Sequence, residues 1–140
     1  MDMENKVRQI RELVEAKREK FARVSDEVWA VPELYFHETK SAAILIKALK
    51  EEGFEVQEGV DGIPTAFIGT WGSGKPVIGI LGEFDALPSL SQEAGCWEHK
   101  EIVKGGPGHG CGHNALGAGA MAAAVAAKDY MEKNGLSGTI

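Results

Sequence analysis

The sequence has 140 residues, which is enough for one compact domain with a hydrophobic core but short for a typical two-domain enzyme. Hydrophobic residues make up 44% and charged residues 26%, a balance typical of a soluble globular domain rather than a disordered chain. The formal net charge of -6 disfavours a nucleic acid or an anionic membrane as the main partner.

The N-terminus and the cysteine content favour a cytoplasmic location. The opening stretch is charged and helix-periodic, without the apolar segment of a secretory signal. The longest apolar stretch, residues 115–127, is rich in alanine and glycine and too short to span a bilayer. Cys96 and Cys111 are the two cysteines, so we expect free thiols or metal ligands rather than a disulfide framework.

Two amphipathic helices are predicted in the first third of the chain. The first covers about residues 3–30, where apolar side chains recur at helical spacings: Val7, Ile10, Val14, Phe21, Val24 and Val28. It ends at Val31-Pro32, because a residue before proline avoids the helical region. The second runs roughly from Thr39 to Glu52, and Gly53 is a suitable residue to end it.

Three β-like segments are predicted next. Residues 54–58 alternate apolar and polar side chains, and residues 65–71 and 77–84 are apolar runs joined by a hairpin-like connection at 72–75. The segment 77–84, VIGILGEF, is the most continuously apolar, so we place it at the centre of the sheet. Residues 85–110 show no clear period and are predicted to form a long loop of the kind that often carries function.

A buried helix and the start of another strand are predicted at the end of the sequence. Small apolar residues favour a helix from about Asn114 to Asn134, ended by Gly135. Residues 136–140 are typical of a turn followed by the first residues of a strand. Because a domain rarely ends by opening a new strand, we expect this sequence to be the N-terminal portion of a longer protein.

Asp85 is the first candidate functional residue, because it directly follows the predicted central strand. Ligands of open α/β sheets bind in the crevice outside the carboxyl ends of the strands, where Asp85 would lie. Glu83 lies two residues earlier, on the same side of the strand. The alternative, to which we give equal weight, is that Asp85 only caps the turn that follows.

Residues 106–117, GPGHGCGHNALG, place Cys111 between His109 and His113 just before a predicted helix. Thiolate and imidazole groups bind zinc and similar ions, and the glycines at 108, 110 and 112 allow the backbone to fold tightly around them. A helix N-terminus also stabilises a thiolate, and Asn114 is a candidate N-cap. The pattern favours a metal site over an incidental glycine-rich turn and over a metal-free enzyme with Cys111 as nucleophile.

The other polar motifs carry weaker signals. His37 precedes a helix and is interpreted as a turn or cap residue, whereas His99 and Cys96 are interpreted as surface residues of the long loop. The stretch GTWGSGK lacks the spacing and the strand-to-helix context of a phosphate-binding loop.

Taken together, GEFDALP and GHGCGHN resemble the motifs of the M20 family of metallopeptidases. The resemblance is greatest to its amidohydrolase branch, which includes N-acyl amino acid hydrolases and aminobenzoyl-glutamate hydrolases, and it spans essentially the whole chain. It implies an α/β fold, a three-layer α/β/α sandwich with a mixed sheet, incomplete here. Residues 1–140 would form the N-terminal part of the metal-dependent catalytic domain, and the dimerisation or lid domain would be absent.

The resemblance also implies roles for individual residues. Cys111 and His113 would bind metal, and Asp85 would be a catalytic residue beside the metal centre. His109 and Asn114 would face the substrate or support the ligands from behind. Paired glutamates and further histidines, which the family carries downstream, are not in this sequence, so the chain would hold half a metal site.

Glu83 and Asn114 depart from the patterns of other branches. Glu83 stands where those branches carry a metal-binding histidine, so that role is not transferred. Asn114 stands where auxin-conjugate and hippurate-type relatives carry aspartate, and it resembles the aminobenzoyl-glutamate group. The substrate implied is therefore an N-acyl or aminobenzoyl amino acid, with an aminobenzoyl-glutamate-like molecule favoured.

The implied activity is metal-dependent hydrolysis of an amide bond. The resemblance implies two divalent ions per complete site, zinc, manganese or cobalt, and a parent protein that is a homodimer or pairs with a homologous subunit. We expect the 140 residues alone to be inactive. The alternative is a truncated, non-catalytic metal-binding or regulatory module of the same fold.

Overall fold

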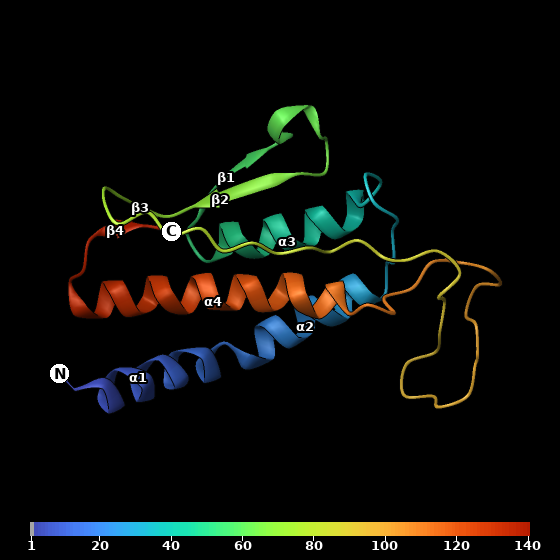
Figure 1. The fold of residues 1–140 in the computed structure, drawn as a ribbon, viewed down its shortest axis with the longest axis horizontal. Coiled ribbons are helices and arrows are strands. Elements are labelled where there is room, and N and C mark those ends of the chain that lie inside the picture. The colour runs from blue at the N-terminus through green and yellow to red at the C-terminus, as the bar shows by residue number, and fades with distance from the viewer. Residues whose placement is uncertain (1) are drawn as a thin grey trace.

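The computed structural model describes residues 2–140 and confirms the α/β class. Along the chain lie α1 (Met3–Ala16), α2 (Arg18–Trp29), α3 (Thr39–Glu51), β1 (Glu55–Glu58), the short 3-10 helix η1 (Val60–Gly62), β2 (Phe67–Thr70), β3 (Gly72–Ser73), α4 (His113–Asn134) and β4 (Gly138–Thr139) (Figure 1). None of the helices in this range combines the length and the apolar character needed to cross a membrane.

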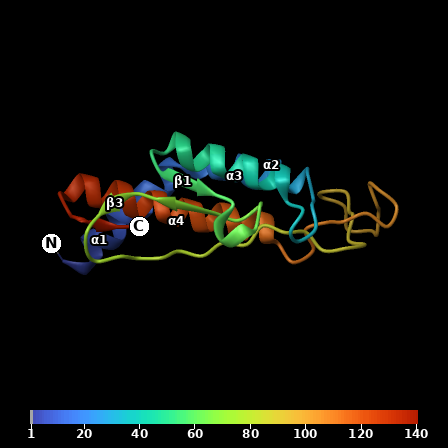
Figure 2. The same cartoon turned by 90° about the horizontal axis from the view of Figure 1, so that it is seen from above.

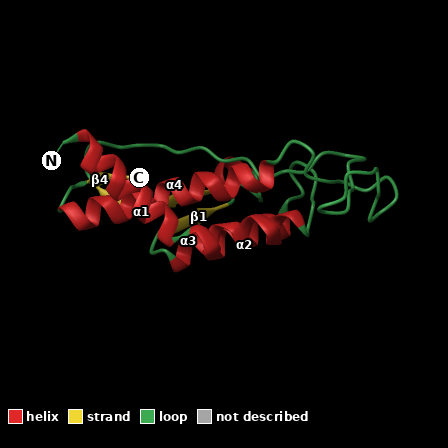
Figure 3. Ribbon diagram, turned by 90° about the horizontal axis from the view of Figure 1, so that it is seen from below, coloured by secondary structure: helices red, strands yellow, loops and turns green. Residues whose placement is uncertain are grey.

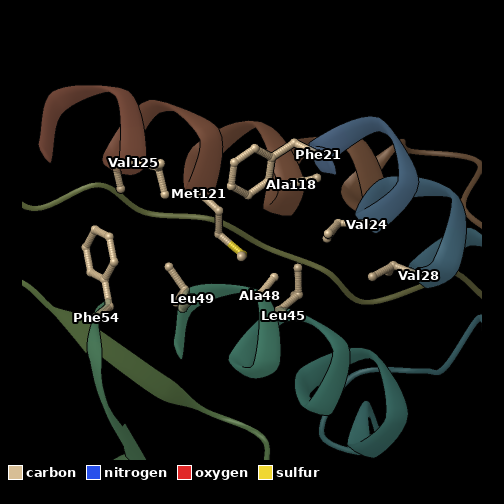
Figure 4. Close-up of a cluster of buried hydrophobic side chains, with 11 residues drawn as sticks. Phe21, Val24, Val28, Leu45, Ala48, Leu49, Phe54, Ala118, Met121 and Val125 are labelled. Carbon is tan, nitrogen blue, oxygen red and sulfur yellow. The ribbon is translucent and has the colours of Figure 1, made fainter. Parts of the chain in front are cut away.

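The hydrophobic core lies where α2, α3 and α4 meet. Helix α2 contacts both α3 and α4, and α3 also contacts β1 and β2, as the view from above illustrates (Figure 2). The core side chains come from all three helices and from the residue that precedes β1: Phe21, Val24, Val28, Leu45, Ala48, Leu49, Phe54, Ala118, Met121, Ala124 and Val125 (Figure 4). The apolar spacing of the sequence therefore identifies these buried helix faces correctly.

The single helix predicted over residues 3–30 is wrong, because the structure divides it into α1 and α2. Lys17, between them, has φ -105° and ψ 1°, which lies outside the helical region. Helix α1 has no buried residue, and Val7, Ile10 and Val14 are each 40–42% exposed. The apolar stripe is continuous in the sequence, but α1 packs against α4 and the start of α2 without reaching the core.

Two small antiparallel pairs make up the β-structure. Strand β1 pairs with β2, with Glu55 opposite Thr70 and Glu58 opposite Phe67, and β3 pairs with β4. The expected hairpin between residues 65–71 and 77–84 is wrong, because β2 pairs with β1, the strand that precedes it in the sequence. The turn after β2 instead brings the end of the chain alongside, where Trp71 and Ile140 exchange two backbone hydrogen bonds of 2.9 Å.

The 77–84 segment is not the central strand that its apolar composition predicts. Only Val77 forms a bridge, with Thr139, and no backbone hydrogen bond reaches Gly79–Phe84 within residues 2–140. Leu81 is 87% exposed. A ladder needs a neighbouring strand, and this range supplies none next to most of the segment. Between the segment and β2 lies an apolar groove of about 360 Å³, lined also by α4.

The helices lie together on one side of the strands, which are seen behind them in the view from below (Figure 3). The second helical layer of an α/β/α sandwich therefore stays a prediction. The long connection between the 77–84 segment and α4 extends past the N-terminal end of α4 (Figures 1 and 3). The candidate residues of the sequence lie where this connection leaves the segment and where it enters the helix.

Candidate metal centre

The backbone around Asp85 is held in place by the residue that follows it. Ala86 is fully buried, and its N–H donates a 2.7 Å hydrogen bond to the carbonyl of Glu33. Farther along, Leu87 and Gly108 exchange two backbone hydrogen bonds of 3.0 Å, which close the long loop at its base. A side chain at Gly108 would lie 1.8 Å from the carbonyl oxygen of Leu90, so only glycine fits there.

Helix α4 brings His113 to the same place. Its N-cap, Gly112, has φ 84°, a left-handed conformation that turns the chain into the helix. Gly117 lies one turn after His113 on the same face, and a Cβ there would be 3.0 Å from the carbonyl oxygen of Glu83. The absence of a side chain therefore lets α4 approach the 77–84 segment and places His113 beside Glu83 of that segment and Asp85, which follows it.

The imidazole of His113 lies between two carboxylates. Its Nδ1 is 2.7 Å from Asp85 Oδ1, and its Nε2 is 3.3 Å from Glu83 Oε2. The side chains of His113 and Asp85 are mostly buried, at 17% and 25% exposure, whereas that of Glu83 is 57% exposed. Asp85 thus contacts His113 rather than the turn that follows it. A carboxylate on Nδ1 fixes the orientation of the ring and leaves Nε2 available to a ligand.

Cys111 lies in the turn two residues before His113, with a free and exposed thiol. Within residues 2–140, no three side chains of His, Cys, Asp or Glu converge closely enough to hold an ion by themselves. The kinds of donor fit a divalent ion, since an imidazole held by a carboxylate is accompanied by a thiol two positions away. His113 and Cys111 are two donors, fewer than a complete metal site has, so they would form part of one.

His109 occupies a different environment from His113. It is 4% exposed, its ring lies 6.2 Å from that of Trp29 at an interplanar angle of 31°, and its nitrogens have no hydrogen-bond partner in the described part of the chain. Burial lowers the pKa of His109 and favours the neutral ring. With Trp29, Val103 and Pro107 it lines a separate cavity of about 330 Å³.

Asn114 is not the N-cap of α4, so that prediction is wrong. The helix begins one residue earlier, because Gly112 supplies the turn and needs no side-chain cap. Asn114 is 8% exposed, and its Nδ2 donates hydrogen bonds to Ser25, 3.0 Å to Oγ and 3.4 Å to the carbonyl oxygen. It therefore joins α4 to α2 behind the His113 cluster, a contact that no local pattern in the sequence indicates.

The weaker candidates lie outside this cluster. The backbone N–H of His37 donates to the carbonyl of Leu34 at 3.0 Å, which confirms it as a turn residue. His99 is exposed as expected, whereas Cys96 is half-buried. The first turn of α3 is capped by Glu33, whose carboxylate accepts 2.9 Å hydrogen bonds from the N–H groups of Lys40 and Ser41. No local pattern in the sequence indicates this contact between Glu33 and α3.

A mixed α/β fold, with a histidine held by a carboxylate where an extended segment meets a helix, is compatible with a hydrolase of peptidase-like fold. A scan against protein-family models finds no match. The chain is 46% identical over 138 residues to one subunit of the p-aminobenzoyl-glutamate hydrolase of Escherichia coli, covering 99% of this chain and 29% of that one. It is 38% identical over 85 residues to thermostable carboxypeptidase 2 of Saccharolobus solfataricus, covering 59% of this chain and 21% of that one.

A solved structure agrees with these relatives. The crystal structure of an aminohydrolase from methicillin-resistant Staphylococcus aureus superimposes with a TM-score of 0.73 at 28% identity, covering 94% of this chain and 33% of that one. These similarities confirm the resemblance to the amidohydrolase branch of the M20 family that the two motifs of the sequence predict. It spans less than a third of the length of the two curated relatives.

Proposed function

We propose that this chain is part of a metal-dependent enzyme that hydrolyses an amide bond of an N-acyl or aminobenzoyl amino acid. The observation that carries the proposal is the contact of His113 with Asp85, because proteins commonly fix metal-binding histidines through a carboxylate on the other ring nitrogen. The relatives support it, since their names describe a hydrolase of p-aminobenzoyl-glutamate and carboxypeptidases.

Cys111 and His113 would hold the ion in this proposal. A bound zinc, manganese or cobalt ion polarises an amide carbonyl and lowers the pKa of a water towards neutrality, and two such ions would be present in a complete site. Asp85, 2.7 Å from Nδ1, would orient the ring so that Nε2 faces the ion. Asn114 holds the first turn of α4 against α2, and His109, a candidate substrate-facing residue, lines the neighbouring cavity.

The substrate we favour is aminobenzoyl-glutamate or a close analogue, because the relative that is 46% identical carries that name. The name also describes that relative as one subunit of its enzyme, so we further propose that the complete protein assembles with a second, homologous subunit or with a copy of itself. We place the enzyme in the cytoplasm.

We also propose that residues 1–140 are the N-terminal part of a larger catalytic domain, with any dimerisation domain outside them. The curated relatives are more than three times as long as the matched region. Within residues 2–140 the amides of Gly79–Phe84 have no backbone partner, and an apolar groove lies open beside β2. Further strands of a larger sheet would pair with these amides and cover the groove. The chain alone would then have little or no activity.

A chimera tests this function. The matched region of the Escherichia coli relative is replaced by this chain, the other subunit of that enzyme is supplied, and hydrolysis of p-aminobenzoyl-glutamate is measured with added zinc, manganese or cobalt. We expect turnover by the chimera, loss of turnover in its His113→Ala form and on chelation, and no turnover by the 140-residue chain alone.

Two results would contradict the proposal. One is turnover that persists in the His113→Ala chimera. The other is a folded chimera, with cooperative unfolding, that binds metal but hydrolyses nothing, which would favour a non-catalytic module. Inactivation by alkylation of Cys111 without any effect of chelators would identify a thiol-dependent enzyme instead.

A further inference from the structure

Glu83 lies beside the ring nitrogen of His113 that does not contact Asp85. Asp85 Oδ1 is 2.7 Å from Nδ1, and Glu83 Oε2 is 3.3 Å from the other nitrogen, Nε2. An imidazole nitrogen and a carboxylate oxygen are both ligands of zinc and similar divalent ions.

The distance between Nε2 and Oε2 fits two ligands of one metal ion. A charge-assisted hydrogen bond between a protonated nitrogen and a carboxylate is typically about 2.7–2.9 Å long, as between Nδ1 and Asp85. Two ligands at roughly 2.0–2.2 Å from one ion lie about 2.9–3.5 Å apart, depending on the angle between their bonds. The Nε2–Oε2 distance of 3.3 Å falls in this second range and beyond the first.

We propose that Glu83 supplies a carboxylate oxygen to the same divalent cation that His113 binds through Nε2. The inference rests on the proposed function, since it concerns the ion of that site. It assigns the two carboxylates of GEFDALP different tasks: Asp85 orients the ring from Nδ1, and Glu83 binds the ion beside Nε2. The carboxylate of Glu83 would thus bind the ion at the position where other branches of the family carry a metal-binding histidine.

The surroundings of Glu83 suit this task. Its backbone is set by the close approach of α4, where Gly117 faces its carbonyl oxygen. Its side chain is 57% exposed and forms no ion pair with a lysine or arginine in residues 2–140. The carboxylate is therefore anchored at its base and free to adjust at its tip, which an oxygen ligand requires when an ion enters.

Zinc titration of the metal-free chimera, which supplies the ligands outside residues 1–140, tests the proposal. Isothermal titration calorimetry would compare the unsubstituted chimera with Glu83→Gln, which keeps the shape and removes the charge, and Glu83→His, which substitutes another metal ligand. Glu98→Gln, an exposed carboxylate in the long loop, controls for loss of one negative charge. We expect zinc affinity to fall at least about tenfold in Glu83→Gln, to recover largely in Glu83→His, and to stay unchanged in Glu98→Gln.

Visible absorption of bound cobalt gives a second readout, because its d–d bands report the ligand set directly. We expect a changed spectrum in Glu83→Gln. If zinc binds with equal affinity and cobalt absorbs identically in the unsubstituted chimera and in Glu83→Gln, while His113→Ala weakens binding, Glu83 is no ligand and the proposed function stands. If the unsubstituted chimera binds neither ion, or binds them independently of His113, both proposals are overturned.

Discussion

At the scale of single residues, the site depends on how two nearby carboxylates share one imidazole. Asp85 and Glu83 are two residues apart on an extended stretch of chain, so their side chains lie on the same face and point towards the N-terminal end of α4. The shorter one reaches Nδ1 at 2.7 Å and the longer one reaches the vicinity of Nε2. A histidine oriented in this way is prepared to bind an ion before the ion arrives.

Replacing Asp85 tests the orienting role. In Asp85→Asn the ring loses its carboxylate partner, and we expect the zinc affinity of the chimera to fall by roughly 10- to 100-fold. Isothermal titration calorimetry measures this, with Asp26→Asn, an exposed aspartate in α2, as the matched control. Unchanged affinity in Asp85→Asn, with both variants folded, would contradict the assigned role.

Glu52 is the residue that most directly couples stability to pH. Its side chain is 7% exposed and lies 2.6 Å from Lys17 Nζ and 2.9 Å from Lys20 Nζ. Burial raises the pKa of Glu52, but the hydrogen bonds from the two lysines outweigh burial and hold the pKa below its ordinary value of 4.5. The folded state therefore favours the ionised form more than the unfolded state does, and this contribution is full above pH 4.5.

We expect Glu52→Gln to lower the free energy of unfolding at pH 7 by about 1–3 kcal/mol, because the lysines lose their charged partner. As pH falls from 4.5 through the lowered pKa, the wild type loses this stabilisation and the variant does not, so the difference between them shrinks. Urea unfolding at pH 7 and at acidic pH measures the difference in free energy of unfolding between the wild type and Glu52→Gln. A difference that grows as the pH falls would show that the sign is wrong.

At the scale of elements, the close contact of α4 with the 77–84 segment determines where the site forms. The small residues of α4 predict a helix that lies near the sheet, and Gly117 and Gly82 do meet there: a Cβ on Gly82 would be 3.3 Å from Gly117 Cα. The pairing of the segment could not be predicted, because it depends on strands that residues 2–140 do not provide. An apolar run shows that burial is required, but it does not identify what covers it.

Two glycines of α4 provide a matched test of this contact. Gly119 has open space around it, so Gly119→Ala should stabilise the chain by up to about 1 kcal/mol through helix propensity. At Gly117 the added methyl group would meet the Glu83 carbonyl at 3.0 Å, so Gly117→Ala should gain less or destabilise, and should weaken zinc binding. Thermal unfolding and calorimetry check both. Equal stabilisation by the two substitutions would contradict the close approach.

Amide hydrogen exchange tests the description of the 77–84 segment. We expect the amides of Gly79–Phe84 to exchange rapidly, because they have no hydrogen-bond partner in residues 2–140, and the paired amides of β1 and β2 to be protected. Mass spectrometry after short labelling would separate the two regions. Protection of Gly79–Phe84 equal to that of β2 would mean that the segment is paired in solution, for example with another copy of the chain.

At the scale of the whole molecule, the sequence indicates the class of fold and the two motifs of the site, while their geometry needed the structure. Periodicity located α3, α4 and the buried face of α2, because helix burial follows a local repeat. It missed the break at Lys17, the contact of Asn114 with Ser25 and the approach of Glu83 to His113, each of which depends on residues that are distant or on backbone geometry.

The most direct test of the account is the position of a metal ion in a zinc-soaked crystal of the chimera, which completes the site around residues 1–140, located by anomalous scattering. We predict an ion at roughly 2.0–2.3 Å from Nε2 of His113 and from Sγ of Cys111, with Asp85 still bonded to Nδ1. An ordered ion bound elsewhere, with Nε2 and Sγ both uncoordinated, would contradict the central claim that this helix entrance is a metal site.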